Sequence, residues 1–381
     1  MSKQKILFIQ RQFSHYRKAV FDRISRDYII TVLHTGIEET IKEEIADYAI
    51  KVKYLKYGKK TTNLIIFGFK EILNKNPDIV IHEANPSILS IIFVFLFKFI
   101  LGYKFVLWGH GYNRTKGFNL DSYKNRIRLL LMKISDAVIF YDYATKNLFC
   151  NYLEQEKLFV ALNTIDTQSM LMQKKMLELQ GRDNLKKKTK FDAQFNLLFL
   201  GRLLKDKKPI EAIMTFLEIK AKLKDTSIKL HIVGKGPEES NIVSLLKMKK
   251  IENDIIMHGE VYEERELAKI LFLSDIVINP GYVGLNVNHA FCFNIPVFTF
   301  SQGKLGPFHS PEIEYIKHDE TGFLAKPFDY DQLAELILTY IRNNTLQERI
   351  KQNIQSYTNN VITIENMIKG LKDCFNYLNS N

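Results

Sequence analysis

Cysteine is scarce in this chain. Its three cysteines, Cys150, Cys292 and Cys374, lie far apart among 381 residues. An odd number at such wide spacing argues against a disulfide framework. No C-x-x-C pair occurs, so a structural zinc site is not expected. A reducing cytoplasm is the simplest compartment for such a chain.

Long apolar runs are also lacking. The run near the N-terminus, residues 6–9, is too short for the core of a signal peptide. The most apolar stretch, residues 88–101, is interrupted by Lys98 and falls short of the ~20 residues that a membrane span needs. We interpret this stretch as a buried helix. A helix that dips into one face of a membrane is the alternative interpretation.

The overall composition is that of a globular protein. Hydrophobic residues make up 46% of the chain and charged residues 25%, which excludes global disorder because so much apolar surface needs burial. At ~150 residues per domain, the length predicts two or three domains.

Positive charge is unevenly distributed along the chain. Residues 1–190 contain 32 Lys and Arg against 18 Asp and Glu, whereas residues 191–381 contain 22 against 24. An excess of this kind favours an anionic partner, such as a lipid surface, a nucleic acid or a phosphorylated substrate. A solubilising lysine-rich surface explains it equally well. We do not expect nucleic-acid binding, because no basic stripe interleaved with aromatic residues occurs.

Short apolar runs alternate with helix-like segments throughout the chain. The strand-like runs form two series, at 6–9, 29–33, 79–82, 105–108, 137–141 and 158–161, and then at 196–200, 229–233, 255–258, 276–279 and 296–300. Such alternation predicts βαβ units and parallel sheets. We therefore expect two α/β domains and two connecting parts, with boundaries at 1–166, 167–195 (a polar linker), 196–345 and 346–381 (terminal helices).

The second half holds the clearest chemical motif. A predicted strand ends at Gly201, Arg202 follows at once, and Lys207 precedes the next predicted helix. Ligands of doubly wound sheets bind beyond the carboxyl ends of the strands. Two cations in such a loop suit a diphosphate.

Two further glycine-bearing turns follow predicted strands. Gly234 opens a Gly-x-Gly-Pro turn, where the absence of a side chain lets the backbone approach a ligand. The second turn runs from Pro280 into a predicted helix whose free N–H groups favour phosphate. Its notable residues are Gly281, Gly284, Leu285, Asn286 and His289.

These motifs occur in a recognisable order. The series Gly-Arg-x4-Lys, Val-Gly-x-Gly-Pro, His-Gly, Pro-x3-Gly-Leu, Pro-Val and Thr-Gly-Phe-Leu, all within residues 196–345, resembles retaining glycosyltransferases of the GT-B fold, and glycosyltransferase family 4 in particular. The resemblance implies two Rossmann-like doubly wound domains facing a cleft, with C-terminal helices crossing back to the first domain. The first domain would bind the acceptor and the second the nucleotide-sugar.

The resemblance also implies roles for single residues. Arg202 and Lys207 match the pair that neutralises the leaving diphosphate, so no metal and no cofactor are expected. The backbone of residues 284–286 matches a phosphate-binding loop. Glu260 and Val261 lie where the family usually holds the base.

One departure from the family pattern affects the donor site. The family typically has two glutamates eight positions apart, and Gly281 and His289 stand there in this chain. A histidine still hydrogen-bonds a ribose hydroxyl, but a glycine offers no carboxylate. Other groups must therefore recognise the sugar.

Candidate residues in the first half are fewer. His110 follows a predicted strand, at a position where the family commonly has a histidine near the reacting sugar; a turn-capping role is the alternative. Asn113 and Arg114 follow it, and Arg114 suits an acceptor phosphate. His15 and Arg17 are further candidate acceptor contacts.

The resemblance implies a retaining, metal-independent hexosyltransferase. The expected partners are a nucleoside-diphosphate sugar, UDP-linked as first choice, and a glycan or lipid-linked acceptor in surface polysaccharide biosynthesis. The basic first half, including Lys51, Lys53, Lys56, Lys59 and Lys60, predicts an anionic membrane as a further partner, so the location would be cytoplasmic or peripheral on the inner face of the plasma membrane. A catalytically silent partner on the same fold and a sugar-nucleotide epimerase are the alternatives.

Overall fold

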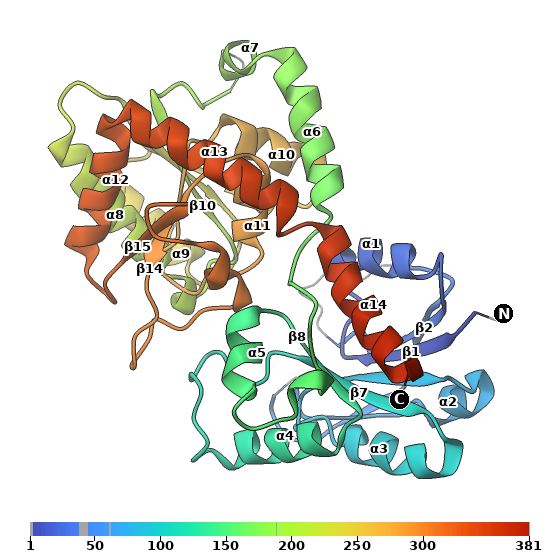
Figure 1. The fold of residues 1–381 in the computed structure, drawn as a ribbon. Coiled ribbons are helices and arrows are strands. Elements are labelled where there is room, and N and C mark those ends of the chain that lie inside the picture. Colours follow the sequence, from blue (N-terminus) through green and yellow to red (C-terminus); the bar gives the residue numbers. More distant parts are fainter. Residues whose placement is uncertain (1–2, 38–44, 61, 188, 381) are drawn as a thin grey trace. The chain divides into compact units, whose positions relative to one another are not determined.

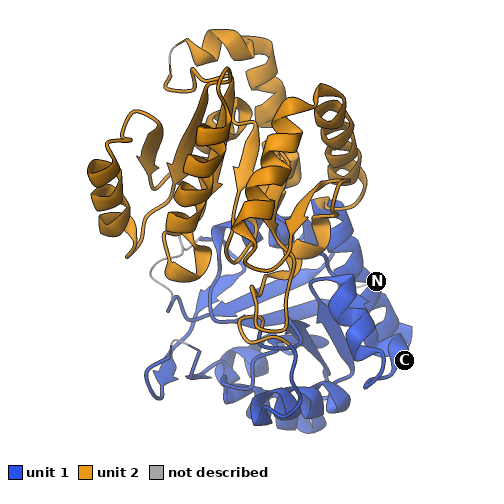
Figure 2. Cartoon of the chain, turned by 90° about the vertical axis from the view of Figure 1, so that its left-hand side faces the viewer, with its two compact units in different colours: residues 1–113, 118–166, 364–381 blue, residues 114–117, 167–363 orange. Residues whose placement is uncertain are grey.

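The computed structural model describes residues 3–37, 45–60, 62–187 and 189–380. The chain forms two compact units, each with helices around a parallel sheet (Figures 1 and 2). The first unit contains residues 1–113, 118–166 and 364–381. The second contains residues 114–117 and 167–363.

The first unit is built on a seven-stranded parallel sheet. Its order is β3-β2-β1-β6-β7-β8-β9, formed by β1 (Lys5–Gln10), β2 (Ile29–His34), β3 (Ala49–Lys51), β6 (Ile79–Glu83), β7 (Lys104–Gly109), β8 (Ala137–Phe140) and β9 (Leu158–Val160). Strand β1 is buried on both faces, which is why it reads as an unbroken apolar run. A separate antiparallel pair, β4 (Tyr54–Lys56) and β5 (Leu64–Ile66), was not predicted.

Helices cover both faces of this sheet. Helices α1 (His15–Ile24) and α14 (Ile364–Ser380) share one apolar cluster with it. The opposite cluster contains side chains from α2 (Phe69–Lys75), α3 (Ser90–Leu101), α4 (Tyr123–Ile134) and α5 (Tyr143–Phe149). At Gly370 a side chain would lie 1.8 Å from the Val160 carbonyl oxygen, so α14 packs directly on β9. The helical spacing predicted for the C-terminal segment therefore places its apolar side in the first unit.

Helix α3 differs from the prediction of a buried helix. Ile91 and Val94 face the core, but Phe99 and Ile100 are 71% and 75% exposed. The interpretation as a buried helix is wrong because the sheet covers only one side of α3. No helix of the described residues is long and apolar enough to cross a membrane.

The second unit repeats the same topology in a six-stranded parallel sheet. Its order is β12-β11-β10-β13-β14-β15, formed by β10 (Phe195–Leu200), β11 (Ile228–Val233), β12 (Ile255–Gly259), β13 (Ile276–Ile278), β14 (Val297–Phe300) and β15 (Gly322–Ala325). Numbered from its own first strand, the order is 3-2-1-4-5-6, as in dinucleotide-binding folds. Its helices include α8 (Pro209–Lys222), α9 (Glu239–Lys249), α10 (Glu264–Leu273), α11 (Asn286–Cys292), α12 (Tyr330–Arg342) and α13 (Asn344–Asn360).

The segment predicted as a linker, residues 167–195, is largely helical. It forms α6 (Thr167–Gln180) and α7 (Arg182–Lys186) within the second unit. Helix α6 packs against α10 and α11. Arg182 donates to the Asp275 carboxylate at 2.6 Å and to the Leu273 carbonyl at 3.0 Å. These contacts make the segment part of the second unit, although few of its residues are apolar.

Candidate functional site

The topology of the second sheet defines where a ligand would bind. Strands β10 and β13 are neighbours, and the strand order reverses between them. In open α/β sheets the crevice lies outside the carboxyl ends of the strands at this switch point. The loops that follow these two strands are residues 201–208 and 279–285, which hold most of the residues predicted for donor binding.

The loop after β10 is fixed to the loop after β11. The Gly201 N–H donates to the Val233 carbonyl at 3.0 Å, and the Leu203 N–H donates to the Lys235 carbonyl at 3.0 Å. A side chain at Gly234 would lie 1.9 Å from the Gly201 carbonyl oxygen. Gly234 is therefore required for the close approach of two loops, whether or not a ligand is bound.

The loop after β13 is fixed to the loop after β10. The Tyr282 N–H donates to the Asp206 carbonyl at 2.9 Å. A side chain at Gly281 would lie 2.3 Å from that same Asp206 oxygen, so the position excludes any side chain. The glycine found where the family typically has a glutamate thus has a local cause: the two loops meet backbone to backbone.

Lys207 lies where these two loops meet. Its ammonium donates to the Tyr282 carbonyl at 2.6 Å and lies 4.7 Å from the centre of the Tyr282 ring. No carboxylate of the described residues lies within ion-pair distance of Lys207. Burial lowers the pKa of Lys207 to about 8, while the charges of Asp206 and Glu312 act in the opposite direction. The site thus holds a half-buried cation that pairs with no carboxylate of the described residues.

Arg202 and the start of α11 complete this arrangement. Arg202 is exposed at the end of β10, and its guanidinium makes no hydrogen bond to any described residue. Asn286 donates to the Leu200 carbonyl at 3.1 Å and accepts from the Gly284 N–H at 2.9 Å. A side chain at Gly284 would lie 3.8 Å from the Lys207 ammonium. The backbone of the predicted phosphate loop therefore borders Lys207.

His309 supports this loop and was not predicted. Its Nδ1 accepts from the Val283 N–H at 3.3 Å, and its Nε2–H donates to the Phe300 carbonyl at 3.0 Å. Only a neutral imidazole satisfies both bonds. Burial lowers the pKa of His309 to about 4. No motif surrounds His309 in the sequence, so only the fold reveals its role.

Three other predicted donor residues lie differently. His289 is half-buried, and its Nδ1–H donates to the Leu285 carbonyl at 2.9 Å, within α11. Glu260 and Val261 follow β12, which is two strands away from β10 in the sheet. The exposed Glu260 hydrogen-bonds the Tyr262 hydroxyl, which raises the pKa of Tyr262. The structure does not bring Glu260 next to Lys207.

The first unit has its own switch point, between β1 and β6. There Arg11 forms an ion pair with Glu83, with 2.7 Å between Arg11 Nε and Glu83 Oε1. His110 is exposed just after β7, and its ring lies 4.8 Å from that of Tyr141. His15 is exposed at the start of α1.

The predicted acceptor residues are not equally accessible. Arg17 is 6% exposed and lies over the rings of Trp108 and Tyr141, at 5.3 Å and 5.1 Å. It also donates to Asn163 and to the Met367 sulfur, so its contacts join α1 to α14. This placement gives Arg17 a packing role.

Asn113 and Arg114 fall in different units. Asn113 is exposed at the end of a first-unit segment. Arg114 is 8% exposed and belongs to the second unit, where its charge acts on the Tyr282 hydroxyl. Arg114 therefore lies near the loop of Lys207.

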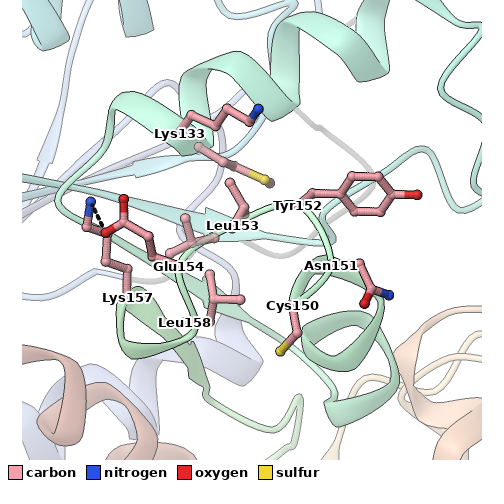
Figure 3. A pocket seen from close by; sticks show the side chains of 10 residues that line it. Lys133, Cys150, Asn151, Tyr152, Leu153, Glu154, Lys157 and Leu158 are labelled. Atoms are coloured by element: carbon pink, nitrogen blue, oxygen red, sulfur yellow. Dashed lines mark ion pairs between the residues drawn. The ribbon is translucent and has the colours of Figure 1, made fainter.

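A cavity of about 500 Å³ opens elsewhere in the first unit (Figure 3). Its walls come from the segments that precede β8 and β9, including Lys133, Cys150 and Tyr152, and Glu154 pairs with Lys157 at its rim. It therefore lies at the amino-terminal edge of these strands, opposite the edge where a switch-point ligand binds. Among the described residues, no group of three or more His, Cys, Asp and Glu side chains is arranged to hold a metal ion.

Comparisons with known proteins agree with this geometry. Residues 181–357 match the family model of glycosyl transferases group 1. An uncharacterized glycosyltransferase, MJ1069 of Methanocaldococcus jannaschii, is 24% identical over 67% of this chain and 62% of that protein. The N-acetyl-alpha-D-glucosaminyl L-malate synthase of Bacillus anthracis is 23% identical over 72% of this chain and 68% of the synthase.

Solved structures show the same fold. The Anabaena Alr3699/HepE structure in complex with UDP superposes with a TM-score of 0.69 at 16% identity, covering 98% of this chain and 100% of that one. The two-unit α/β architecture is that of GT-B glycosyltransferases, as predicted. Together, these comparisons show that the chain has the GT-B fold and that it is similar in sequence to glycosyltransferases, whereas it spans less than two thirds of the length of the archaeal relative.

Proposed function

We propose that this protein transfers a sugar from a nucleoside-diphosphate sugar to a hydroxyl group and retains the anomeric configuration. The observation that carries the proposal is the half-buried Lys207 ammonium, which lies at the switch point without an ion-pair partner among the described residues. A buried charge is costly unless a counter-charge compensates it. A diphosphate would supply that compensation.

Arg202 and Lys207 would act on the leaving group. As the bond to the sugar breaks, negative charge grows on the diphosphate, and cations already in place stabilise it without reorganisation. The Gly284 backbone beside Lys207 would contact the same phosphates. In this proposal the two side chains replace a metal ion, so activity should survive EDTA.

The identities of the donor and the acceptor are inferred from other observations. UDP is the first choice because the Anabaena structure of the same fold was solved with UDP. The acceptor would be a glycan or a lipid-linked oligosaccharide in surface polysaccharide biosynthesis. His110, His15 and Asn113 are the exposed first-unit residues that we assign to the acceptor or to the transferred sugar.

Titration calorimetry with UDP, GDP and ADP, each with EDTA, tests the donor site. We expect UDP to bind and Arg202→Ala to weaken that binding. NMR of the anomeric proton during turnover of a UDP-sugar then tests retention. An inverted product would exclude the retaining mechanism, and strict metal dependence would exclude the role given to the two cations.

One observation favours a second candidate, a catalytically silent partner on this fold. Gly281 excludes any side chain where the family typically has a glutamate. Such a protein would bind a nucleotide but neither hydrolyse nor transfer its sugar. Turnover by the purified chain would exclude this candidate. Release of an isomerised sugar-nucleotide without acceptor would instead indicate an epimerase.

A further inference from the structure

The outer side of α3 is apolar along its whole length. Of its twelve residues only Ser90 and Lys98 are polar. Ser90 is buried, and Lys98 points to the Asp136 carboxylate, with 2.8 Å between the charged atoms. The solvent-facing positions are five large apolar residues, each between 47% and 75% exposed: Ile92, Phe93, Leu96, Phe99 and Ile100.

Helix α4 continues this apolar surface. It lies on the same face of the sheet as α3, because both helices contribute to one core cluster (Figure 1). Its exposed apolar residues recur at helical spacing, at Tyr123, Ile127, Leu130 and Ile134. Helix α2 borders α3 on this face, since the rings of Phe69 and Phe97 lie 4.2 Å apart. Exposed Leu73 extends the surface there.

The charge on these three helices is predominantly positive. They contain seven Lys and Arg and a single acidic residue, the half-buried Glu71. The exposed cations are Lys70, Lys75, Arg126 and Lys133. Apolar side chains flanked by cations, without exposed carboxylates, are the pattern of helices that lie in a membrane interface.

We propose that the outer surface of α2, α3 and α4 docks on an anionic membrane. The apolar residues of α3 and α4 would enter the boundary between headgroups and acyl chains. Arg126 and Lys133 would contact the anionic headgroups. The proposal rests on the proposed function, because the expected benefit of docking is that it brings the enzyme to a lipid-linked acceptor. Binding to the membrane is measured independently of turnover.

Charge complementarity favours a membrane over a protein partner. A protein interface of this kind would need both a matching apolar face and carboxylates opposite the cations. An anionic bilayer supplies both to any flat apolar surface rimmed by lysine and arginine. The helices are too short to cross the bilayer, so the protein would lie on it.

Flotation with vesicles tests this proposal. The full chain is mixed with vesicles of phosphatidylcholine alone or with 30% phosphatidylglycerol added, and we expect clear binding only to the anionic vesicles. The double variant Phe99→Gln/Ile100→Gln should reduce the partition coefficient about 10- to 100-fold, because it removes two apolar side chains from the interface. Arg126→Gln/Lys133→Gln should reduce it about 10-fold, and added salt should do the same.

A matched variant on another helix is the control. Met172→Gln/Leu179→Gln changes two exposed apolar residues on α6, which are 65% and 90% exposed, and this variant should bind vesicles like the wild type. All three variants alter exposed side chains, so circular dichroism melts should match the wild type. The proposal would be overturned if the wild type did not bind anionic vesicles, or if the α3 and α6 variants lost vesicle binding to the same extent. So would a dimer that Phe99→Gln/Ile100→Gln abolishes while vesicle binding persists. UDP affinity of the α3 variant should be unchanged, which separates this outcome from failure of the proposed function.

Discussion

The two sheets share a strand order, but the cations at their switch points have different partners. In the first unit, Arg11 is paired with Glu83 at 2.7 Å, and the Arg11 N–H also donates to that carboxylate at 3.3 Å. In the second, the Lys207 ammonium is held by a carbonyl and a ring, without a carboxylate of the described residues in ion-pair range. The cation of the first crevice is neutralised by a carboxylate of the chain, whereas Lys207 has no such carboxylate among the described residues.

This difference gives the two crevices different electrostatic properties although their sheets share a topology. A pre-paired arginine costs little to bury and has little left to offer an anion. A half-buried lysine with only neutral partners is partly desolvated at a cost to the free protein, and this favours anion binding. The comparison therefore supports our proposal that the nucleotide binds in the second unit, and this support does not depend on the motif series.

Removing the cation of each crevice should separate the two units most clearly. Lys207→Met should lower turnover about 10²- to 10³-fold, as the loss of one preorganised charge-stabilising group does. It should leave the melting temperature unchanged or raised, because the variant no longer buries a charge with a lowered pKa. Steady-state kinetics and calorimetric melts measure both effects.

Arg11→Met is the matched variant in the first unit. It leaves Glu83 without its partner, so we expect a lower melting temperature. UDP affinity should stay within about twofold of the wild type, since Arg11 belongs to the other crevice. Equal loss of UDP binding in both variants would remove the distinction between the crevices.

Two glycines of the 279–285 loop test the backbone contact that shapes the second crevice. A methyl group at Gly281 would lie 2.3 Å from the Asp206 oxygen, whereas one at Gly284 would meet only the Lys207 ammonium, at 3.8 Å. Gly281→Ala should therefore cost about 3 kcal/mol of unfolding free energy, and Gly284→Ala much less. Urea unfolding of both variants measures the difference. Equal stability would mean that the two loops separate at little cost.

The sequence was informative about the fold where strands are buried on both faces. The runs at 6–9 and 196–200 lie within β1 and β10 because a central parallel strand has no polar side. It did not predict β3, β4, β5 and β15. Strands β3 and β4 contain no buried residue, so they leave no core-facing apolar pattern in the sequence. Helix α6 was missed because just three of its fourteen residues are buried, too few for a clear period.

Charge counted along the sequence misled the interpretation. The two halves differ by 16 charges, but the two units hold 25 Lys and Arg against 18 Asp and Glu, and 29 against 24. The lysine-rich residues 167–190 account for most of the change, because the fold places them in the second unit. A local surface, such as that of α2 to α4, is the meaningful scale for a membrane argument.

The candidate site was predictable only where chemistry follows a motif. Arg202 and Lys207 follow a predicted strand at a recognisable spacing, and the structure places the loop that contains them at the switch point. The support given by His309 could not be predicted, since it depends on a contact with Val283 across 26 residues. The buried state of Arg17 depends likewise on Met367, 350 residues away.

Acid should destabilise the second unit more than the first. Burial lowers the pKa of His231 to about 3 and of His309 to about 4 in the second unit, and of His82 to about 4 in the first. Below about pH 6.5 these rings take up protons in the unfolded chain but remain neutral in the folded one. The free energy of unfolding therefore decreases as the pH is lowered. Each ring contributes about 2 kcal/mol of this loss at pH 5.

The single tryptophan separates the two units in this experiment. Trp108 is buried in the first unit, so its fluorescence reports that unit, whereas far-ultraviolet circular dichroism reports both. At pH 5 the dichroism transition should begin at a lower temperature than the fluorescence transition. Coinciding transitions at pH 7 and at pH 5 would show that the units unfold together and that the histidines do not distinguish them.

The smallest effect expected is the pH dependence of UDP binding. Because burial lowers the pKa of Lys207 to about 8, its ammonium is mostly deprotonated at pH 9, and affinity should fall about tenfold between pH 7 and pH 9. Arginine keeps its charge over this range, so Lys207→Arg should bind UDP with an affinity that does not change with pH, whatever its absolute value. Titration calorimetry at three pH values measures both slopes. A tenfold fall in UDP affinity that persists in Lys207→Arg would show that a group other than Lys207 titrates between pH 7 and pH 9. Lys207 would then not be the cation that distinguishes the second crevice from the paired Arg11 of the first.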